Sequence, residues 1–177
     1  MKSISEKLKE IIRDVPDFPK KGILFKDITP VLEHPIFCKE LALEMIKPFE
    51  NQQIHAVAGI ESRGFLFGPL MAQLLNVPFV LIRKEGKLPW KTIKQEYDLE
   101  YGTATIEVHE DSIKTNHNVL IHDDLLATGG TAEAAAQIVN KLGAHVAGFS
   151  FLVKLSFLEG EKKLKIYSPK IANIADF

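Results

Sequence analysis

The sequence predicts an α/β fold in which a central, mostly parallel sheet is flanked by helices. Short apolar runs at residues 54–60, 78–82 and 119–121 have the composition of buried parallel strands. Helical patterns at residues 66–75 and 131–142 alternate with these runs, as in βαβ units. Polar residues directly follow two of the strands, at the sheet edge where open parallel sheets bind ligands.

Length and composition indicate a single domain over residues 1–177 with a sizeable core. The net charge of −1 gives no bulk attraction to nucleic acid or to anionic membranes, so neither is expected as a partner. Cys38 is the only cysteine in the sequence, which excludes an internal disulfide. It lies within a segment of helical pattern, and we expect it to be a small core residue. The first six residues show no apolar signal region, and we therefore expect a cytoplasmic location.

Capping and proline signals organise the N-terminal part. Residues 3–6 have the pattern of a capping box, and the apolar spacing behind them predicts a helix to about Asp14. Pro16 breaks this helix. Residues 23–30 indicate a short extended piece followed by a turn, and Pro35 suits the first turn of a second helix.

Residues 64–82 contain no charged side chain, which by length alone would permit a membrane helix. Pro69 and Pro78 interrupt the run, so a helix followed by a buried strand explains it better. No membrane association is expected.

The two regions that flank the central motif are less regular. Residues 83–90 are polar and basic and contain Gly and Pro, which predicts a long loop, while residues 103–108 alternate as in a half-exposed strand. Together they would form a flap over about 83–108. After Gly143, a helix C-cap, we expect a strand at 145–153, a short helix within 157–164 and a last strand at 165–167.

The central motif spans residues 119–131 and is followed by an Ala-rich helix. Asp123 and Asp124 end the strand, and residues 127–131 then offer small side chains and hydroxyls at a helix N-terminus. Such a loop exposes backbone N–H groups that suit a phosphate, and glycines let the anion approach them. Taken alone, the two aspartates would also fit a solvated turn. Residues 128–131 alone would also fit an ordinary loop with Thr131 near the helix N-cap. The P-loop and Rossmann glycine patterns are absent from the sequence.

Residues 119–131 resemble the signature of the type I phosphoribosyltransferase family, which binds phosphoribosyl pyrophosphate. Residues 17–30, 62–68, 82–89 and 99–102 resemble the hood, the second motif and the flap of its adenine-specific members. The resemblance implies the type I phosphoribosyltransferase fold, with a small hood at about 17–34 and a flexible flap. It also implies a homodimer.

The resemblance also implies roles for individual residues. The two acids would bind the ribose hydroxyls, and the loop behind them would hold the 5-phosphate. Phe25 would stack on adenine, the backbone of Leu24 would read the edge of the base, Arg63 would help to place base and pyrophosphate, and Glu100 would be the proton donor. The expected substrate-binding residues are Leu24, Phe25, Lys26, Arg63, Arg83, Lys84, Lys87, Tyr101, Asp123, Asp124, Ala127, Thr128, Gly129, Gly130 and Thr131, and the expected catalytic residues are Glu100, Arg63, Asp123 and Asp124.

Several of these assignments keep a plain alternative. Arg83, Lys84 and Lys87 would either clamp the leaving pyrophosphate or belong to a solvated loop. Glu100 alone would also fit a surface residue. His122 stands where the family usually has an apolar residue, and we expect it to be a packed strand residue.

The predicted reaction is Mg²⁺-dependent transfer of 5-phosphoribosyl from phosphoribosyl pyrophosphate to adenine, which gives AMP and pyrophosphate in purine salvage. Substrate oxygens and water would hold most of the Mg²⁺, without a protein metal cage. Another purine base is the nearest alternative. A non-catalytic regulator that senses phosphoribosyl pyrophosphate is a second, but the sequence shows no basic helix for nucleic acid.

Overall fold

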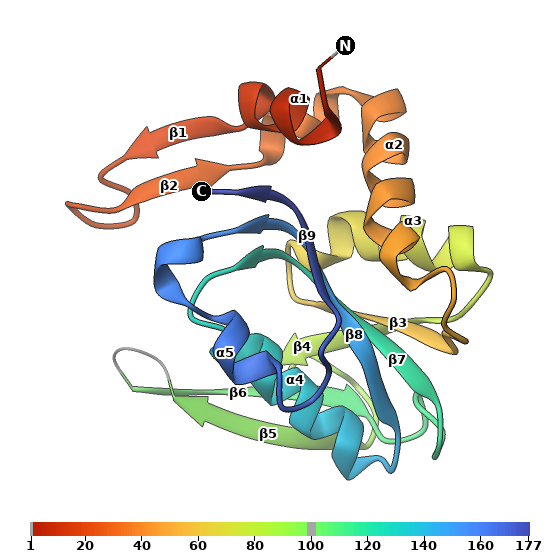
Figure 1. Cartoon of the computed structure of the whole chain (residues 1–177). Helices are drawn as coiled ribbons and strands as arrows, with labels where there is room; N and C mark the ends of the chain where they lie inside the picture. The colour runs from red at the N-terminus through yellow and green to blue at the C-terminus, as the bar shows by residue number, and fades with distance from the viewer. Residues whose placement is uncertain (1, 99–101) are drawn as a thin grey trace.

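The computed structural model of the chain describes residues 2–98 and 102–177 (Figure 1). The helices in these ranges are α1 (Ile4–Ile11), α2 (Pro35–Ile46), α3 (Gly64–Leu75), α4 (Gly130–Lys141) and α5 (Glu161–Leu164), with 3₁₀ turns η1 (Thr29–Glu33), η2 (Lys47–Phe49) and η3 (Ser156–Leu158). The strands are β1 (Arg13–Pro16), β2 (Leu24–Asp27), β3 (Ala56–Ile60), β4 (Phe79–Lys84), β5 (Thr92–Asp98), β6 (Thr103–His109), β7 (Asn118–Leu126), β8 (His145–Lys154) and β9 (Ile171–Asp176).

The main sheet has the strand order β5-β6-β4-β3-β7-β8-β9. Strands β4, β3, β7, β8 and β9 are parallel, while β6 runs antiparallel to both β4 and β5. From β3 the chain passes through α3 to β4 on one side, and from β7 it passes through α4 to β8 on the other. The order therefore reverses between β3 and β7, and the crevice beyond their carboxyl ends is the expected ligand site.

Helices cover both faces of the sheet, as the layers in Figure 1 show. Leu120 packs with Phe67 and Met71 in the core under α1, α2 and α3, whereas Ile121 packs with Ala135 in the core under α4. Neighbouring residues of β7 face opposite layers because side chains alternate along a strand. This confirms the predicted α/β fold with a mostly parallel sheet.

The β1–β2 hairpin forms a separate two-stranded sheet beside the C-terminus. The Lys26 ammonium lies 4.1 Å from the centroid of the Phe177 ring, and Lys9 lies 5.2 Å from it. These contacts tie the hairpin and α1 to the end of the chain.

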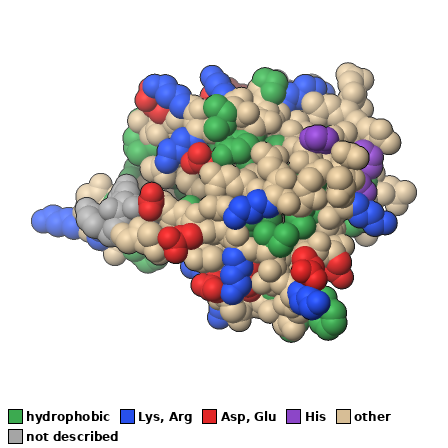
Figure 2. Space-filling model, turned by 90° about the horizontal axis from the view of Figure 1, so that it is seen from below, with side chains coloured by type: hydrophobic (Ala, Val, Ile, Leu, Met, Phe, Trp, Pro, Cys, Tyr) green, Lys and Arg blue, Asp and Glu red, His purple; other side chains and the backbone are tan. Residues whose placement is uncertain are grey.

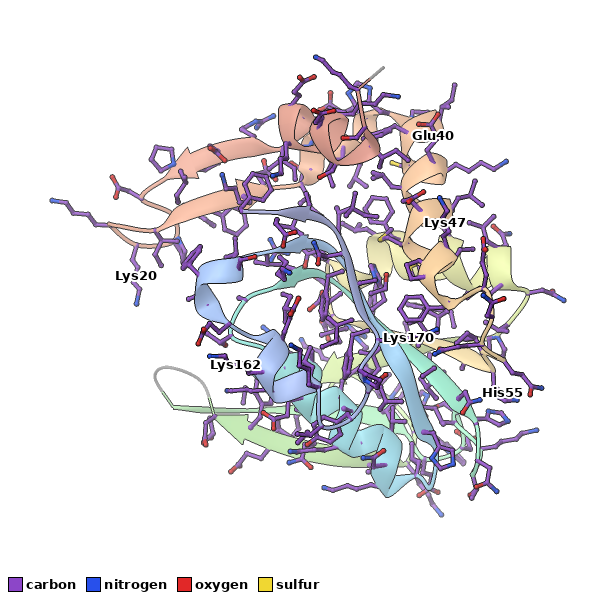
Figure 3. All side chains as sticks on the ribbon, viewed as in Figure 1. Lys20, Glu40, Lys47, His55, Lys162 and Lys170 are labelled. Atoms are coloured by element: carbon purple, nitrogen blue, oxygen red, sulfur yellow. The ribbon has the colours of Figure 1, made fainter. Side chains whose placement is uncertain are left out.

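On the face shown in Figure 2, acidic and basic side chains are interspersed. In Figure 3, Lys20 marks the tip of the hairpin and Lys162 marks α5.

Most elements expected from the sequence are confirmed. The capping box is present, since Ser3 Oγ accepts a hydrogen bond from the backbone N–H of Glu6 at 3.2 Å, and Glu6 Oε2 accepts one from the N–H of Ser3 at 2.7 Å. Cys38 is buried in the core. The uncharged run at 64–82 divides into α3 and β4, and within the described ranges no helix combines the length and hydrophobicity that a membrane crossing requires.

The first helix and the last strand differ from expectation. Helix α1 ends at Ile11 rather than near Asp14, because Arg13–Pro16 pairs with the second hairpin strand. Residues 165–167 are not a strand. The last strand is β9 at Ile171–Asp176, which adds to the edge of β8.

Two further strands were misjudged from the sequence. The acid pair does not end β7, which continues through Asp123 and Asp124 to Leu126 because β8 pairs with it over that length. The expected flap at about 83–108 contains a strand that the sequence did not predict, β5, which pairs with β6 from Thr92 to Asp98. Its alternation was hard to see because its partly buried face includes Gln95 as well as Ile93 and Tyr97.

Candidate active site

The acid pair lies near the carboxyl end of β7, at the point where the strand order reverses. Asp124 is buried and Asp123 is half-buried, and Asp123 Oδ1 accepts a hydrogen bond from the Asp124 N–H at 2.9 Å. Burial, and then the neighbouring charge of Asp124, raise the pKa of Asp123 well above its usual range. Burial also raises the pKa of Asp124, although the positive charge of Arg63 opposes this rise. Ligand hydroxyls or a cation at this position would favour the charged carboxylates.

Arg63 connects the acid pair to the hairpin. It occupies the N-cap position of α3, and its Nε lies 3.1 Å from Asp124 Oδ2. The guanidinium carbon also lies 5.2 Å from the centroid of the Phe25 ring, which belongs to β2. Phe18 supports that ring edge-on at 5.0 Å, and the neighbouring Leu24 is half-exposed. A residue expected to stack on a base and a residue expected to bind ribose therefore contact the same arginine.

The segment of residues 127–131 joins β7 to α4 and surrounds a cavity of about 80 Å³ together with Asp123. The helix begins with the Glu133 N–H donating to Gly129 O at 2.8 Å. The N–H groups before Glu133 therefore lack partners within the helix and are available to an anion. Ala127, Thr128, Gly129, Gly130 and Thr131 all lie around this cavity, next to Asp123, as the sequence suggested.

Gly129 has a second reason to be glycine. Its φ of +80° is a left-handed conformation, and a Cβ there would lie 2.6 Å from the carbonyl oxygen of Gly160. A side chain at Gly129 would therefore disturb the loop whether or not an anion is bound. At Gly130, by contrast, the nearest atom to a Cβ would be Asp98 O at an ordinary 3.5 Å. Sequence reasoning missed Gly160 because it lies about thirty residues from the loop.

Tyr97 is another residue that sequence reasoning missed. The Thr131 hydroxyl donates to the Tyr97 hydroxyl at 3.2 Å, so that β5 contacts the first turn of α4. Tyr97 precedes Glu100 and Tyr101, which lie outside the described residues. The predictions for Glu100 and Tyr101 therefore stay predictions.

The basic residues after β4 are arranged by carboxylates. Arg83 donates from Nε and Nη2 to the two carboxylate oxygens of Glu61, each at 3.1 Å, and the Lys84 N–H donates to Glu61 Oε2 at 3.0 Å. The hydrogen bond from Arg83 is the main cause that lowers the pKa of Glu61. Lys84 and Lys87 are exposed. Lys26 pairs with Asp14 at 2.6 Å within the hairpin.

His122 is a packed strand residue, as expected. It is completely buried, with Nδ1 2.9 Å from the carbonyl oxygen of Ser150. Burial lowers its pKa to about 4, so the ring is neutral near pH 7. Across residues 2–98 and 102–177, no group of three or more His, Cys, Asp or Glu side chains gathers in a way that could hold a metal ion.

Comparison with known proteins places these features in a family. The family model described as "Phosphoribosyl transferase domain" matches residues 28–172. The adenine phosphoribosyltransferase of Natranaerobius thermophilus is 51% identical over 165 residues, which cover 93% of this chain and 96% of the relative. That of Nitrosococcus oceani is 50% identical over 163 residues, covering 92% and 95%.

Solved structures agree with the sequence relatives. The adenine phosphoribosyltransferase of Thermoanaerobacter pseudethanolicus superposes with a TM-score of 0.94 at 46% identity, covering 99% of this chain and 100% of that one. The enzyme of Saccharomyces cerevisiae, solved with adenine and an imino-altritol bisphosphate, gives a TM-score of 0.90 at 38% identity, covering 97% and 98%.

Proposed function

This chain belongs to the phosphoribosyl transferase family, and on that premise we propose that it transfers 5-phosphoribosyl from phosphoribosyl pyrophosphate to adenine, giving AMP and pyrophosphate. The observation that carries the proposal is the position of Arg63, in contact with both Phe25 and Asp124. A base at the hairpin and a sugar at the acid pair would then lie on adjacent sides of one arginine.

The sugar would be held at both of its ends. Asp123 and Asp124 would accept hydrogen bonds from the ribose hydroxyls, and residues 127–131 would receive the 5-phosphate on free N–H groups and hydroxyls. Asp123 lines the same cavity as residues 127–131, which supports this assignment. Fixing both ends of the ribose positions its anomeric carbon for attack. The entropy that a bimolecular encounter would lose in the transition state is then already lost on binding, which lowers the barrier.

The base would stack on Phe25, with the backbone of the half-exposed Leu24 at its edge. The bond from the anomeric carbon to pyrophosphate breaks as the bond to N9 of adenine forms, and N9 loses its proton. We propose Glu100 as the acid/base that shares a proton with the purine ring. Such groups typically contribute about a hundred- to ten-thousand-fold to the rate.

The pyrophosphate would leave toward Lys84 and Lys87, and Arg63 would help to place it, while Arg83 would act mainly through its pair with Glu61. The carboxylates of Asp123 and Asp124 fit a Mg²⁺ ion that takes most of its ligands from substrate oxygens and water. When bound, the ion would neutralise charge on the pyrophosphate. A cytoplasmic homodimer remains part of the proposal.

Turnover with a panel of bases tests the function. The full-length protein with Mg²⁺ and phosphoribosyl pyrophosphate should form AMP from adenine and react far more slowly with hypoxanthine, guanine and xanthine. Preference for another base would contradict the assignment to adenine. Binding of phosphoribosyl pyrophosphate without turnover of any base would favour the sensing regulator.

The Glu100→Gln variant tests the proposed acid/base in the same assay. It should lose roughly a hundredfold or more in kcat while it still binds phosphoribosyl pyrophosphate, because the phosphates are held elsewhere. Full kcat in this variant would remove Glu100 from the mechanism without affecting the assignment of the reaction.

A further inference from the structure

Two exposed cations, Lys84 and Lys87, lie at the end of β4 and on the turn that follows it, at residues 85–88. Lys84 ends β4, and Lys87 follows Gly86, whose φ of +79° reverses the chain. Lysine side chains are flexible, so their positions depend on the backbone that carries them. The contacts that hold this backbone therefore determine where the two charges lie.

A buried carboxylate of β6, that of Glu107, holds the turn by hydrogen bonds to its backbone. Glu107 is only 2% exposed, although the alternation of residues 103–108 would place it on the solvent side of its strand. Its Oε1 accepts the backbone N–H groups of Lys87 and Leu88, each at 3.0 Å, and its Oε2 accepts the Thr92 hydroxyl at 3.1 Å. One side chain thus binds two successive amides of the turn and the first residue of β5.

Lys87 is held by both of its backbone groups. Its N–H donates to Glu107, and its carbonyl oxygen accepts a hydrogen bond from Arg83 Nη1 at 3.1 Å. Arg83 stands opposite Glu107 in the β4–β6 pairing and is itself fixed by Glu61. The turn is therefore fixed between two carboxylates, Glu61 at the end of β3 and Glu107 on β6.

The chemistry of Glu107 indicates that it is charged. Burial raises its pKa, but hydrogen bonds from Leu88, Thr92 and Lys87 outweigh this effect and hold the pKa below its usual value. Lys94, the residue opposite it on β5, directs its ammonium to Glu85 at 2.7 Å. The hydrogen-bond partners of Glu107 are thus the backbone of the turn and a hydroxyl, and a buried charge is costly unless such partners satisfy it.

We propose that Glu107 is a positioning residue for the pyrophosphate half of the substrate: it holds the turn that presents Lys84 and Lys87 to that group. The inference rests on the proposed function, because it assumes that these cations receive pyrophosphate. Glu107 itself does not touch the substrate in this scheme. Its removal should therefore weaken binding of ligands that carry pyrophosphate and leave binding of AMP unchanged.

The test compares four full-length proteins: wild type, Glu107→Leu, Glu107→Gln and Glu85→Leu. Leucine removes both acceptor oxygens at Glu107. Glutamine keeps one acceptor for the two N–H groups and can donate to Thr92, so it should restore most of the effect. Glu85→Leu is the matched control, because it removes one negative charge from the same turn without removing a backbone contact.

The dissociation constants for phosphoribosyl pyrophosphate and for AMP would be measured by calorimetry, with urea unfolding as a check on stability. We expect Glu107→Leu to bind phosphoribosyl pyrophosphate roughly ten- to a hundredfold more weakly, since displacements of about 1 Å have effects of this size. AMP affinity should stay within twofold of wild type, and the Glu85→Leu control should match wild type for both ligands.

Equal losses for both ligands, or no loss for either, would overturn the proposal, as would an equal effect of Glu85→Leu. A wild-type protein that binds no phosphoribosyl pyrophosphate would instead contradict the proposed function. The two failures are therefore distinguishable within one experiment.

Discussion

Substitution of Gly160 by alanine should disturb the loop of residues 127–131, which we propose binds the 5-phosphate, although Gly160 lies outside this loop. Gly160 has φ −56° and ψ −24°, a helical conformation that alanine adopts without strain. The added methyl group would collide with Ala127 O and would lie only 2.9 Å from the Gly129 nitrogen and 3.0 Å from the Thr128 carbonyl carbon. The effect of the substitution is therefore steric and falls directly on the loop.

The size of the effect follows from these distances. Restoring an ordinary separation of about 3.4 Å requires the Gly129 nitrogen to move by roughly half an ångström, and the closer Ala127 oxygen to move by roughly one ångström. Overpacking of this kind typically costs about 1–3 kcal/mol of folding stability. Because a misplacement of 1 Å can cost about a hundredfold in function, we expect ribose 5-phosphate to bind roughly ten- to a hundredfold more weakly.

Calorimetry with ribose 5-phosphate and urea unfolding would be applied to Gly160→Ala and to a control, Gly148→Ala. A Cβ at Gly148 would collide with the Phe49 ring and lie 2.7 Å from Lys170 O, in contacts that involve no residue of the loop. The control should lose stability but keep its affinity. Unchanged affinity in Gly160→Ala, or an equal loss in Gly148→Ala, would refute the argument.

Two predictions concern stability. The pKa of His122 is about 4 in the folded chain and 6.5 ordinarily, so between these pH values the unfolded chain binds one proton more than the folded chain. The contribution of His122 to the free energy of unfolding is therefore fully present above pH 6.5 and is lost as the pH falls toward 4. Urea titrations should show that the free energy of unfolding falls by about 2 kcal/mol less between pH 7 and pH 5 in His122→Leu than in wild type. An unchanged pH profile in the variant would contradict this. Ser3→Ala removes the cap of α1 and should lower the free energy of unfolding by about 1 kcal/mol in urea titrations, whereas no change would mean that the capping box does not stabilise the fold.

The central motif could be predicted from the sequence because its parts are contiguous. Asp123, Asp124 and residues 127–131 follow one another along a strand, a loop and a helix, and local geometry alone places them at one sheet edge. The same holds for the capping box at Ser3, where donor and acceptor lie three residues apart. Interactions of this range depend on backbone conformation and not on the rest of the fold.

The partners of these residues were decided by tertiary structure alone. Arg63 meets Phe25 because α3 and the hairpin fold against the same edge, and Gly160 meets Gly129 because β8 carries the following turn past β7. The polar face of a short strand gave no sign that Glu107 would be buried, since its burial depends on a turn twenty residues away. Local sequence thus determined which groups the site contains, while packing between distant segments determined which of them meet, because that packing depends on the whole core.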